Sequence, residues 1–167
     1  MQLTCLTKAD CELIRIWRNK DISVYRTAYL ITEDMQADFY KDVISNRKSD
    51  CRFWAVLDDQ VFIGMVGLVN ISLENRNAEI SIVIDPELRQ SGKGKEALEL
   101  LLDKGFNEVN LDTIYGECYY NNPGIRFWEN MIKKFHGIFT ELKARKYSLG
   151  MYHDSLYFTF FKDTWRK

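Results

Sequence analysis

The sequence has little of what marks several common protein classes. It contains only two prolines and no proline-rich or glycine-rich tract, which excludes a collagen-like or low-complexity chain, and its 46% hydrophobic content excludes a disordered one. The four cysteines form no C-x-x-C pair, and only two histidines accompany them. We therefore expect free thiols, with neither a disulfide framework nor a metal site.

Long apolar runs and an excess of charge of one sign are also missing. No run approaches the ~20 residues of a membrane span, and the first residues lack the charged start and apolar core of a secretory signal. The 23 basic and 24 acidic side chains leave a net charge of -1, so the chain as a whole has no electrostatic reason to bind nucleic acid or an anionic membrane. We expect a cytoplasmic protein of one domain, residues 1–167, which binds a small molecule as a monomer or homodimer.

What is present is a regular alternation of strand and helix patterns. Helices are expected at 9–17, 32–45, 94–106 and 123–134, and strands at 2–7, 53–57, 61–69, 78–84, 113–119, 138–146 and 155–162. In the first helix, Leu13, Ile16 and Trp17 are expected to share one face. The third helix is expected to bury Ala97, Leu98, Leu101, Leu102 and Phe106. Early hairpins followed by strand–loop–helix units favour a single α/β or α+β domain.

The most informative stretch runs from the apolar strand that stops at Asp85-Pro86 into a leucine-rich helix. Its loop carries Gly92 and Gly94, two residues apart, so backbone N–H groups and the positive end of the helix dipole point to one place. That arrangement is typical of a phosphate or pyrophosphate site. The spacing fits neither a dinucleotide fingerprint nor a Walker loop. Local positive charge comes from Arg89, Lys93 and Lys95.

The pattern R-x-x-G-x-G, formed by Arg89, Gly92 and Gly94, resembles the acetyl-coenzyme A pyrophosphate loop of the GNAT N-acetyltransferase superfamily. Residues 121–130 are similar to its N-x-x-S/A-I-R-x-x-E-K helix start, with Gly124 and Asn130 as departures. The resemblance implies acetyl-CoA as cosubstrate. It also implies the GNAT fold: a central mixed, mostly antiparallel twisted sheet of about seven strands flanked by about four helices.

The resemblance further implies which residues contact the coenzyme. Backbone donors of Ile82, Val83 and Ile84 would hold the pantetheine arm and the thioester carbonyl. The remaining contacts implied are Arg89, Gln90, Ser91, Gly92, Lys93, Gly94, Lys95, Asn121, Arg126 and Trp128.

The mechanism implied is direct attack of an amine on the thioester, without a metal or a covalent enzyme intermediate. An alkylammonium has a pKa of ~10.4, so a base must first remove a proton. Glu79, on the central strand, is predicted as that base; its alternative role is to pair with a cation or orient the substrate. Trp128 stands where many relatives have an acidic tyrosine, and indole cannot act as the acid. The coenzyme then leaves as a thiolate, or Tyr147 or Tyr152 supplies the proton.

Evidence about the acceptor comes from the block Trp17-Arg18-Asn19 and from the aromatic segment that follows it. This block resembles the nucleotide-linked amino-sugar N-acetyltransferases, in the branch that also holds ribosomal-protein N-terminal acetyltransferases. The resemblance implies that Arg18 meets a diphosphate and that Tyr25 or Tyr29 stacks on base or sugar. The alternative is structural: Trp17 fills the core, while Arg18 and Asn19 cap the helix end.

Two further hypotheses stay open. Residues 77–80 resemble the spermidine N-acetyltransferase pattern, which implies a polyamine acceptor and an acidic pocket. Candidate carboxylates for that pocket are Glu33, Asp34, Glu74 and Glu79. The second hypothesis belongs to another class of protein. It takes the chain as a coenzyme-binding module without a catalytic proton path, and Trp128 is the one indication for it.

Overall fold

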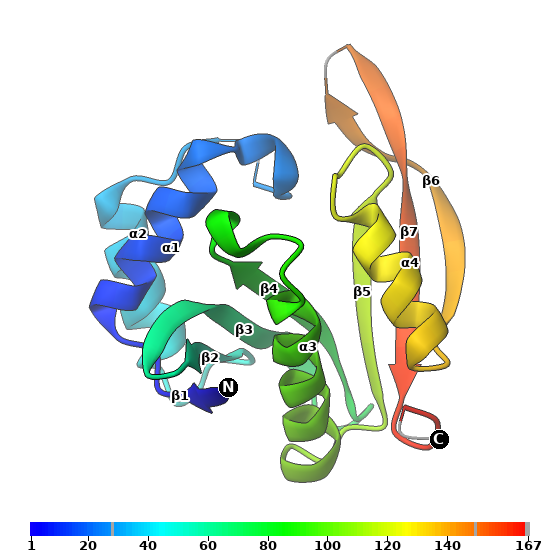
Figure 1. The fold of residues 1–167 in the computed structure, drawn as a ribbon, viewed down its shortest axis with the longest axis horizontal. Coiled ribbons are helices and arrows are strands. Elements are labelled where there is room, and N and C mark those ends of the chain that lie inside the picture. The colour runs from blue at the N-terminus through cyan, green and yellow to red at the C-terminus, as the bar shows by residue number, and fades with distance from the viewer. Residues whose placement is uncertain (28, 149, 166–167) are drawn as a thin grey trace.

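The computed structural model describes residues 1–27, 29–148 and 150–165, which form a twisted seven-stranded sheet with helices on both faces (Figure 1). The strand order is β1-β2-β3-β4-β5-β7-β6, and neighbouring strands are antiparallel except for the parallel pair β4–β5. This mixed, mostly antiparallel sheet confirms the predicted fold class. The strands are β1 (Gln2–Thr4), β2 (Arg52–Asp58), β3 (Val61–Ser72), β4 (Asn77–Ile84), β5 (Thr113–Tyr119), β6 (Ile138–Ser148) and β7 (Met151–Phe161).

The helices lie in two layers. α1 (Lys8–Lys20) and α2 (Glu33–Phe39) cover one face of the sheet, and α3 (Lys93–Asp103) and α4 (Ile125–Lys134) cover the other. One π-helical turn extends α2 and another extends α3: η2 (Tyr40–Ile44) and η4 (Lys104–Glu108). Short 3-10 helices follow α1 and β4: η1 (Ile22–Val24) and η3 (Pro86–Leu88). None of the helices in the described part of the chain is long and apolar enough to cross a bilayer.

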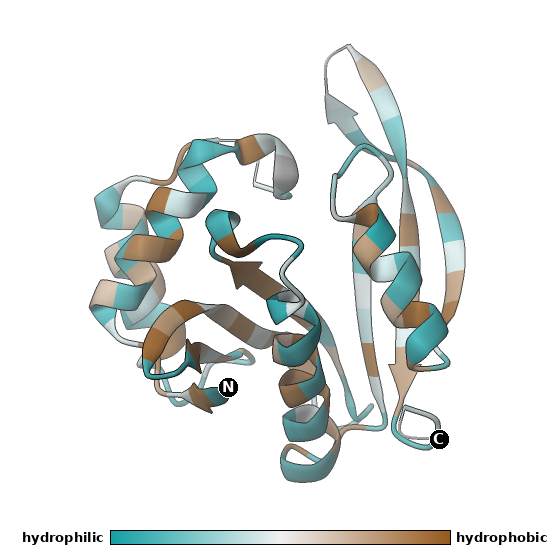
Figure 2. Ribbon diagram, viewed as in Figure 1, coloured by the Kyte–Doolittle hydropathy of each residue, from teal (hydrophilic) through white to brown (hydrophobic). Residues whose placement is uncertain are grey.

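A hydrophobic core lies on each side of the sheet. Because successive side chains of a strand point to opposite faces, Met65 of β3 joins the core under α1, and Val66 joins the core under α3 and α4. Figure 2 shows the apolar residues concentrated on the strands and the inward helix faces. The predicted face of the third helix is confirmed, since its members are fully buried: Ala97, Leu98, Leu101, Leu102 and Phe106.

Of the three residues predicted to share the apolar face of α1, only Trp17 is buried. Leu13 and Ile16 stay 40% and 41% exposed, and the buried residues are Cys11, Ile14 and Trp17. The Trp17 ring stacks on Phe62 of β3 at a centroid distance of 5.7 Å. This aromatic contact fixes the rotation of the helix about its axis, and Leu13 and Ile16 then face outward.

Some element ends also differ from the prediction because local hydrogen bonds intervene. β1 stops at Thr4 rather than at residue 7, since Thr7 is the N-cap of α1 and forms a capping box with Asp10. α4 begins at Ile125 rather than at Pro123, after a turn in which the Asn122 side chain accepts a hydrogen bond from the Gly124 amide at 2.7 Å.

Candidate active site

Strands β4 and β5 begin side by side and then separate. Their parallel pairing covers only the first three residues of each strand, ending at Glu79 and Tyr115, whereas β4 stays paired with β3 as far as Ile84. The two ribbons diverge toward their carboxyl ends (Figure 1). In the described sheet, the backbone groups of residues 80–84 that face β5 thus have no partner strand. They are free to bind a ligand, as the sequence predicts for Ile82, Val83 and Ile84.

A cleft of about 1020 Å³ opens where the strands part, large enough for an extended small molecule. It brings together residues that the sequence predicts from four separate segments. The predicted residues that line it are Arg18, Tyr25, Glu79, Ile82, Val83, Ile84, Arg89, Gln90, Gly92, Gly94, Lys95, Arg126 and Trp128. A smaller hollow of about 560 Å³ beside α3 and α4 contains none of the predicted site residues.

The amino end of α3 offers bare backbone to the cleft. Gly92, its N-cap, has a φ of +87°, a conformation that favours glycine, and a Cβ built there would meet no atom within 4 Å. A Cβ on Gly94 would meet only the ring of Phe127, at 3.6 Å. Neither glycine has a side chain to cap the helix, so first-turn N–H groups and the helix dipole remain available for an anion. The pyrophosphate of acetyl-CoA fits this arrangement.

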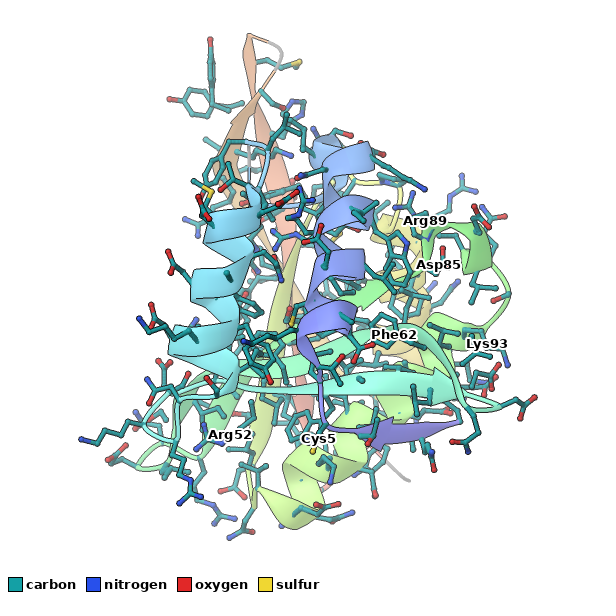
Figure 3. All side chains as sticks on the ribbon, turned by 90° about the vertical axis from the view of Figure 1, so that its left-hand side faces the viewer. Cys5, Arg52, Phe62, Asp85, Arg89 and Lys93 are labelled. Carbon is teal, nitrogen blue, oxygen red and sulfur yellow. The ribbon has the colours of Figure 1, made fainter. Side chains whose placement is uncertain are left out.

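The side chains of this loop divide into two groups. Arg89 lies beside Tyr25; burial raises the pKa of that tyrosine, while the guanidinium groups of Arg89 and Arg18 oppose the rise. Lys93 instead reaches Asp58 of β2 at 2.8 Å, and this hydrogen bond lowers the pKa of the aspartate. Figure 3 labels Asp85, Arg89 and Lys93 along the path from β4 into α3.

Two further predicted coenzyme contacts lie away from the cleft lining. The Ser91 hydroxyl donates to the carbonyl of Leu88 at 2.6 Å, and the Asn121 amide donates to the Ser148 hydroxyl at 3.4 Å. Asn122 lines the cleft in place of its neighbour. Trp128 also lines it, with its indole stacked on Phe158 at 4.6 Å. The side chains of Lys93, Ser91 and Asn121 therefore contact the protein itself.

Glu79 lines the cleft at the point where the pairing of β4 with β5 ends. Its side chain is 12% exposed, forms an ion pair with Arg26, and accepts a hydrogen bond from the Asn70 amide at 3.1 Å. Asn70 has a φ of +53° at an irregularity in the β3–β4 pairing, which turns its side chain toward the carboxylate. Sequence reasoning missed Asn70 and Arg26. The sequence held one signal for Asn70: it stands at the end of a strand pattern, and asparagine tolerates a left-handed backbone there.

A second carboxylate, Glu117 of β5, lines the cleft beside Glu79 and was also missed. It accepts hydrogen bonds from the Arg145 guanidinium at 3.0 Å and from the Ser155 hydroxyl at 2.6 Å. Burial alone would raise the pKa of Glu117, but these two donors lower it. The signal available in the sequence was alternation, because Tyr115, Glu117 and Tyr119 share the half-buried face of β5.

Cys118 lines the cleft without the properties of a nucleophile. Its side chain is buried, and burial raises the pKa of the thiol to about 12. It therefore stays protonated at neutral pH, whereas a reactive cysteine needs its thiolate. This favours direct attack on a bound thioester over acyl transfer through the cysteine. Among the described residues, no three His, Cys, Asp or Glu side chains group closely enough to hold a metal ion.

The Trp17-Arg18-Asn19 block is divided between the cleft and the scaffold. Arg18 lines the cleft, donates to the Thr27 hydroxyl at 2.6 Å and lies 5.2 Å from the centre of the Tyr25 ring. Its buried Nε has no hydrogen-bond partner among the described residues, and burial lowers the pKa of the guanidinium. Trp17 is part of the core, and Asn19 bonds to the backbone of Ile31 instead of facing the cleft.

Of the four predicted tyrosines, Tyr25 lines the cleft, and Tyr29, Tyr147 and Tyr152 do not. Tyr29 is 61% exposed, and Tyr147 is 65% exposed on the β6–β7 hairpin, edge-on to the ring of Tyr152. Neither belongs to the residues that line the cleft. The structure thus does not bring Tyr147 to the thioester position, and the described residues of the hairpin project beyond the body of the sheet (Figure 1).

Comparisons with known proteins agree with this architecture. Residues 1–126 match the acetyltransferase (GNAT) domain family. The chain is 28% identical over 127 residues to spermidine N(1)-acetyltransferase of Vibrio cholerae serotype O1, covering 74% of this chain and 72% of that protein. It is 31% identical over 112 residues to a Bacillus subtilis (strain 168) protein named as a ribosomal N-acetyltransferase, YdaF, covering 66% of this chain and 59% of that one.

Solved structures extend the likeness over nearly the whole chain. Spermidine N-acetyltransferase from Vibrio cholerae in complex with CoA and spermine superposes with a TM-score of 0.85 at 23% identity, covering 99% of this chain and 98% of that one. A chimera of the same enzyme and hSSAT gives 0.83 at 24% identity, covering 97% and 95%. At this identity the likeness shows a shared fold. The divergent β4–β5 cleft, the glycine loop and the match over residues 1–126 together show that the chain belongs to the GNAT acetyltransferase family, whose cosubstrate is acetyl-CoA.

Proposed function

We propose that this acetyltransferase transfers the acetyl group of acetyl-CoA to a primary amine of a small cationic acceptor of the polyamine class. The observation that carries the proposal is the Glu79 carboxylate, which lies in the cleft beside the divergent strands and already holds a cation, Arg26. The likeness to spermidine N(1)-acetyltransferase supports the same acceptor class. It favours the polyamine hypothesis over the nucleotide-linked amino sugar.

The roles of the chain's own residues follow from their positions. Bound acetyl-CoA supplies an activated thioester. The amides of residues 82–84 hold and polarise its carbonyl, while the backbone at Gly92 and Gly94 and the Arg89 side chain hold the pyrophosphate. Glu79 binds the acceptor ammonium and takes its proton, so that the neutral amine attacks directly. The acetyl C–S bond then breaks, and the coenzyme leaves as a thiolate because the indole of Trp128 cannot donate a proton to the sulfur. The second proton of the attacking nitrogen passes to water.

One observation supports the amino-sugar hypothesis as a second candidate. Arg18 lines the cleft with a buried Nε that has no hydrogen-bond partner among the described residues, and a guanidinium in that state suits a phosphate or carboxylate. An anionic acceptor would use Arg18, and a polyamine would use Glu79. The two candidates thus depend on different side chains of one cleft.

Release of free coenzyme thiol should be measured with acetyl-CoA and three kinds of acceptor. These are spermidine and spermine, an amino-sugar nucleotide, and a peptide with a free amino terminus; a reaction without acceptor gives the hydrolysis background. We expect the polyamines to give the highest kcat/KM. Turnover of the sugar nucleotide alone, lost in Arg18→Lys, would overturn the polyamine proposal, because lysine cannot reproduce the planar fork of arginine.

A further inference from the structure

Arg26 extends from an irregular segment into the part of the cleft around Glu79 and Glu117. We call this part the acceptor arm, and the part around residues 82–84 and the glycine loop the coenzyme arm. The segment joins η1 to α2 and is tied to the body of the protein near its start. Arg18 donates to the Thr27 hydroxyl, and Lys146 of β6 donates to the backbone carbonyl of Ser23 in η1 at 3.1 Å. Arg26 extends from this anchored position to β4 and β5. There it forms the ion pair with Glu79 and donates to the backbone carbonyl of Glu117 at 3.4 Å.

The guanidinium occupies the position that a cationic acceptor needs. Glu117 is the other carboxylate lining the described cleft, and its side chain is already engaged by Arg145 and Ser155. Glu79 is therefore the carboxylate left to receive an ammonium, and its charged partner is Arg26. An acceptor amine and Arg26 cannot both neutralise it at close range without placing two cations together.

The exposures of the two partners differ in a way that permits exchange. Glu79 is nearly buried at 12% exposure, so its carboxylate requires a partner whenever no acceptor is bound. Arg26 is 47% exposed, so its charged end remains hydrated after leaving the carboxylate. The pair therefore has one hydrated and one nearly buried partner, and an incoming ammonium can take the place of the hydrated guanidinium beside the carboxylate.

We propose that Arg26 is an internal occupant of the amine position, which the acceptor must displace from Glu79 before transfer. The inference rests on the proposed function, because it takes the acceptor to be cationic. It makes Arg26 a specificity-determining residue: the chain binds cations that compete successfully with a guanidinium held within the same molecule. Removing Arg26 then raises the affinity for cationic acceptors.

Calorimetric titration of spermidine into the CoA complex tests this directly. Arg26→Gln should bind spermidine about threefold to tenfold more tightly than the wild type. This range lies between the effects of breaking an exposed ion pair and of breaking a buried one. The matched control is Arg76→Gln, because Arg76 also pairs with a carboxylate, Asp112 at 3.0 Å, but lies outside the cleft lining. It should leave spermidine affinity unchanged. Equal or weaker binding by Arg26→Gln would overturn the inference.

A second measurement separates displacement from a role in orienting Glu79. Guanidinium ion at millimolar concentration should compete with spermidine in Arg26→Gln and have little effect on the wild type, with sodium chloride at equal ionic strength as control. In the double variant Arg26→Gln/Glu79→Gln, the gain in spermidine affinity should disappear. If Arg26 orients the carboxylate, its removal lowers kcat and guanidinium restores it, which would contradict displacement.

The outcomes also distinguish this inference from the proposed function. If the wild type acetylates no polyamine, the proposed function fails. The calorimetric comparison still decides whether Arg26 occupies a cation site, since it needs no turnover. If the wild type acetylates spermidine but Arg26→Gln gains no affinity, the function stands and the inference fails.

Discussion

The two arms of the cleft are made of different parts of the chain. In the coenzyme arm, the ligand faces backbone: the unpaired edge of β4 and the side-chain-free turn at Gly92 and Gly94. In the acceptor arm, the ligand faces side chains from separate elements, with Glu79, Asn70 and Arg26 in one connected group. A backbone surface keeps its chemistry when side chains change, whereas a side-chain surface is altered by any single substitution. Under the proposed function, the first arm fixes the cosubstrate and the second sets the acceptor.

The largest effect is expected from removing the carboxylate that we propose as the base, Glu79. Glu79→Gln keeps the shape of the side chain but removes its charge and its proton acceptor. It should lower kcat about 10²- to 10⁴-fold, the range for a general base, with an unchanged KM for acetyl-CoA. Steady-state kinetics measure both constants, and Glu74→Gln, in the exposed β3–β4 turn, is the control. An equal loss of coenzyme binding would contradict the division between the arms.

An intermediate effect is expected in the coenzyme arm, where two neighbouring cations differ in what they face. Arg89 lines the cleft, while Lys93 is held by Asp58. Arg89→Gln should weaken coenzyme binding about tenfold to a hundredfold, the range for a hydrogen bond to a charged group. Lys93→Gln should change it by less than about twofold. Calorimetry with CoA compares them; equal losses would mean that loop charge, rather than side-chain placement, determines binding.

The smallest effect concerns the support of the acceptor arm, and it depends on pH. Hydrogen bonds from Arg145 and Ser155 hold the pKa of Glu117 below its ordinary value, against the effect of burial. A carboxylate with a lowered folded-state pKa stabilises the protein above its ordinary pKa, and that stabilisation is lost as pH falls through the folded-state pKa. Removing the carboxylate should therefore flatten the acid side of the stability profile.

Urea denaturation between neutral pH and about pH 3 measures this contribution. Glu117→Gln should be less stable than the wild type at neutral pH by about 1 kcal/mol, and the difference should shrink as the medium becomes acidic. Glu129→Gln, an exposed position on α4, is the control and should follow the wild-type curve. A difference that grows on acidification would mean that Glu117 is not held as a carboxylate.

The coenzyme arm could be predicted from the sequence because its signals are local. The strand that stops at Asp85-Pro86, the glycine spacing and the apolar period of α3 all lie within about twenty-five consecutive residues, where periodicity is informative. For Ser91 and Lys93 the prediction stays open for the backbone groups alone, because Leu88 and Asp58 engage the two side chains. Periodicity within one segment could not show these two contacts.

The acceptor arm could be predicted only in part because it is assembled from long-range contacts. Arg26 lies in an irregular segment without periodicity, and its partners are 53 residues away at Glu79 and 91 residues away at Glu117. The prediction of which residues of α1 face the core was wrong for a related reason. Two overlapping sets of apolar residues fit the helical period, and the choice between them depends on Phe62 of a distant strand.

Asn19 ties the acceptor arm to the scaffold with a pair of hydrogen bonds. Its side chain donates to the carbonyl of Ile31 at 2.8 Å and accepts from the amide of the same residue at 2.9 Å. The two ends of the intervening segment are thus held at one point of the scaffold. Under the proposed function this segment carries Arg26 to the cleft, so substitutions within it are the ones expected to change the choice of acceptor. Tyr25 has to be kept in such an exchange, because its ring packs against the core beside α1 and lies next to Arg89 of the coenzyme loop.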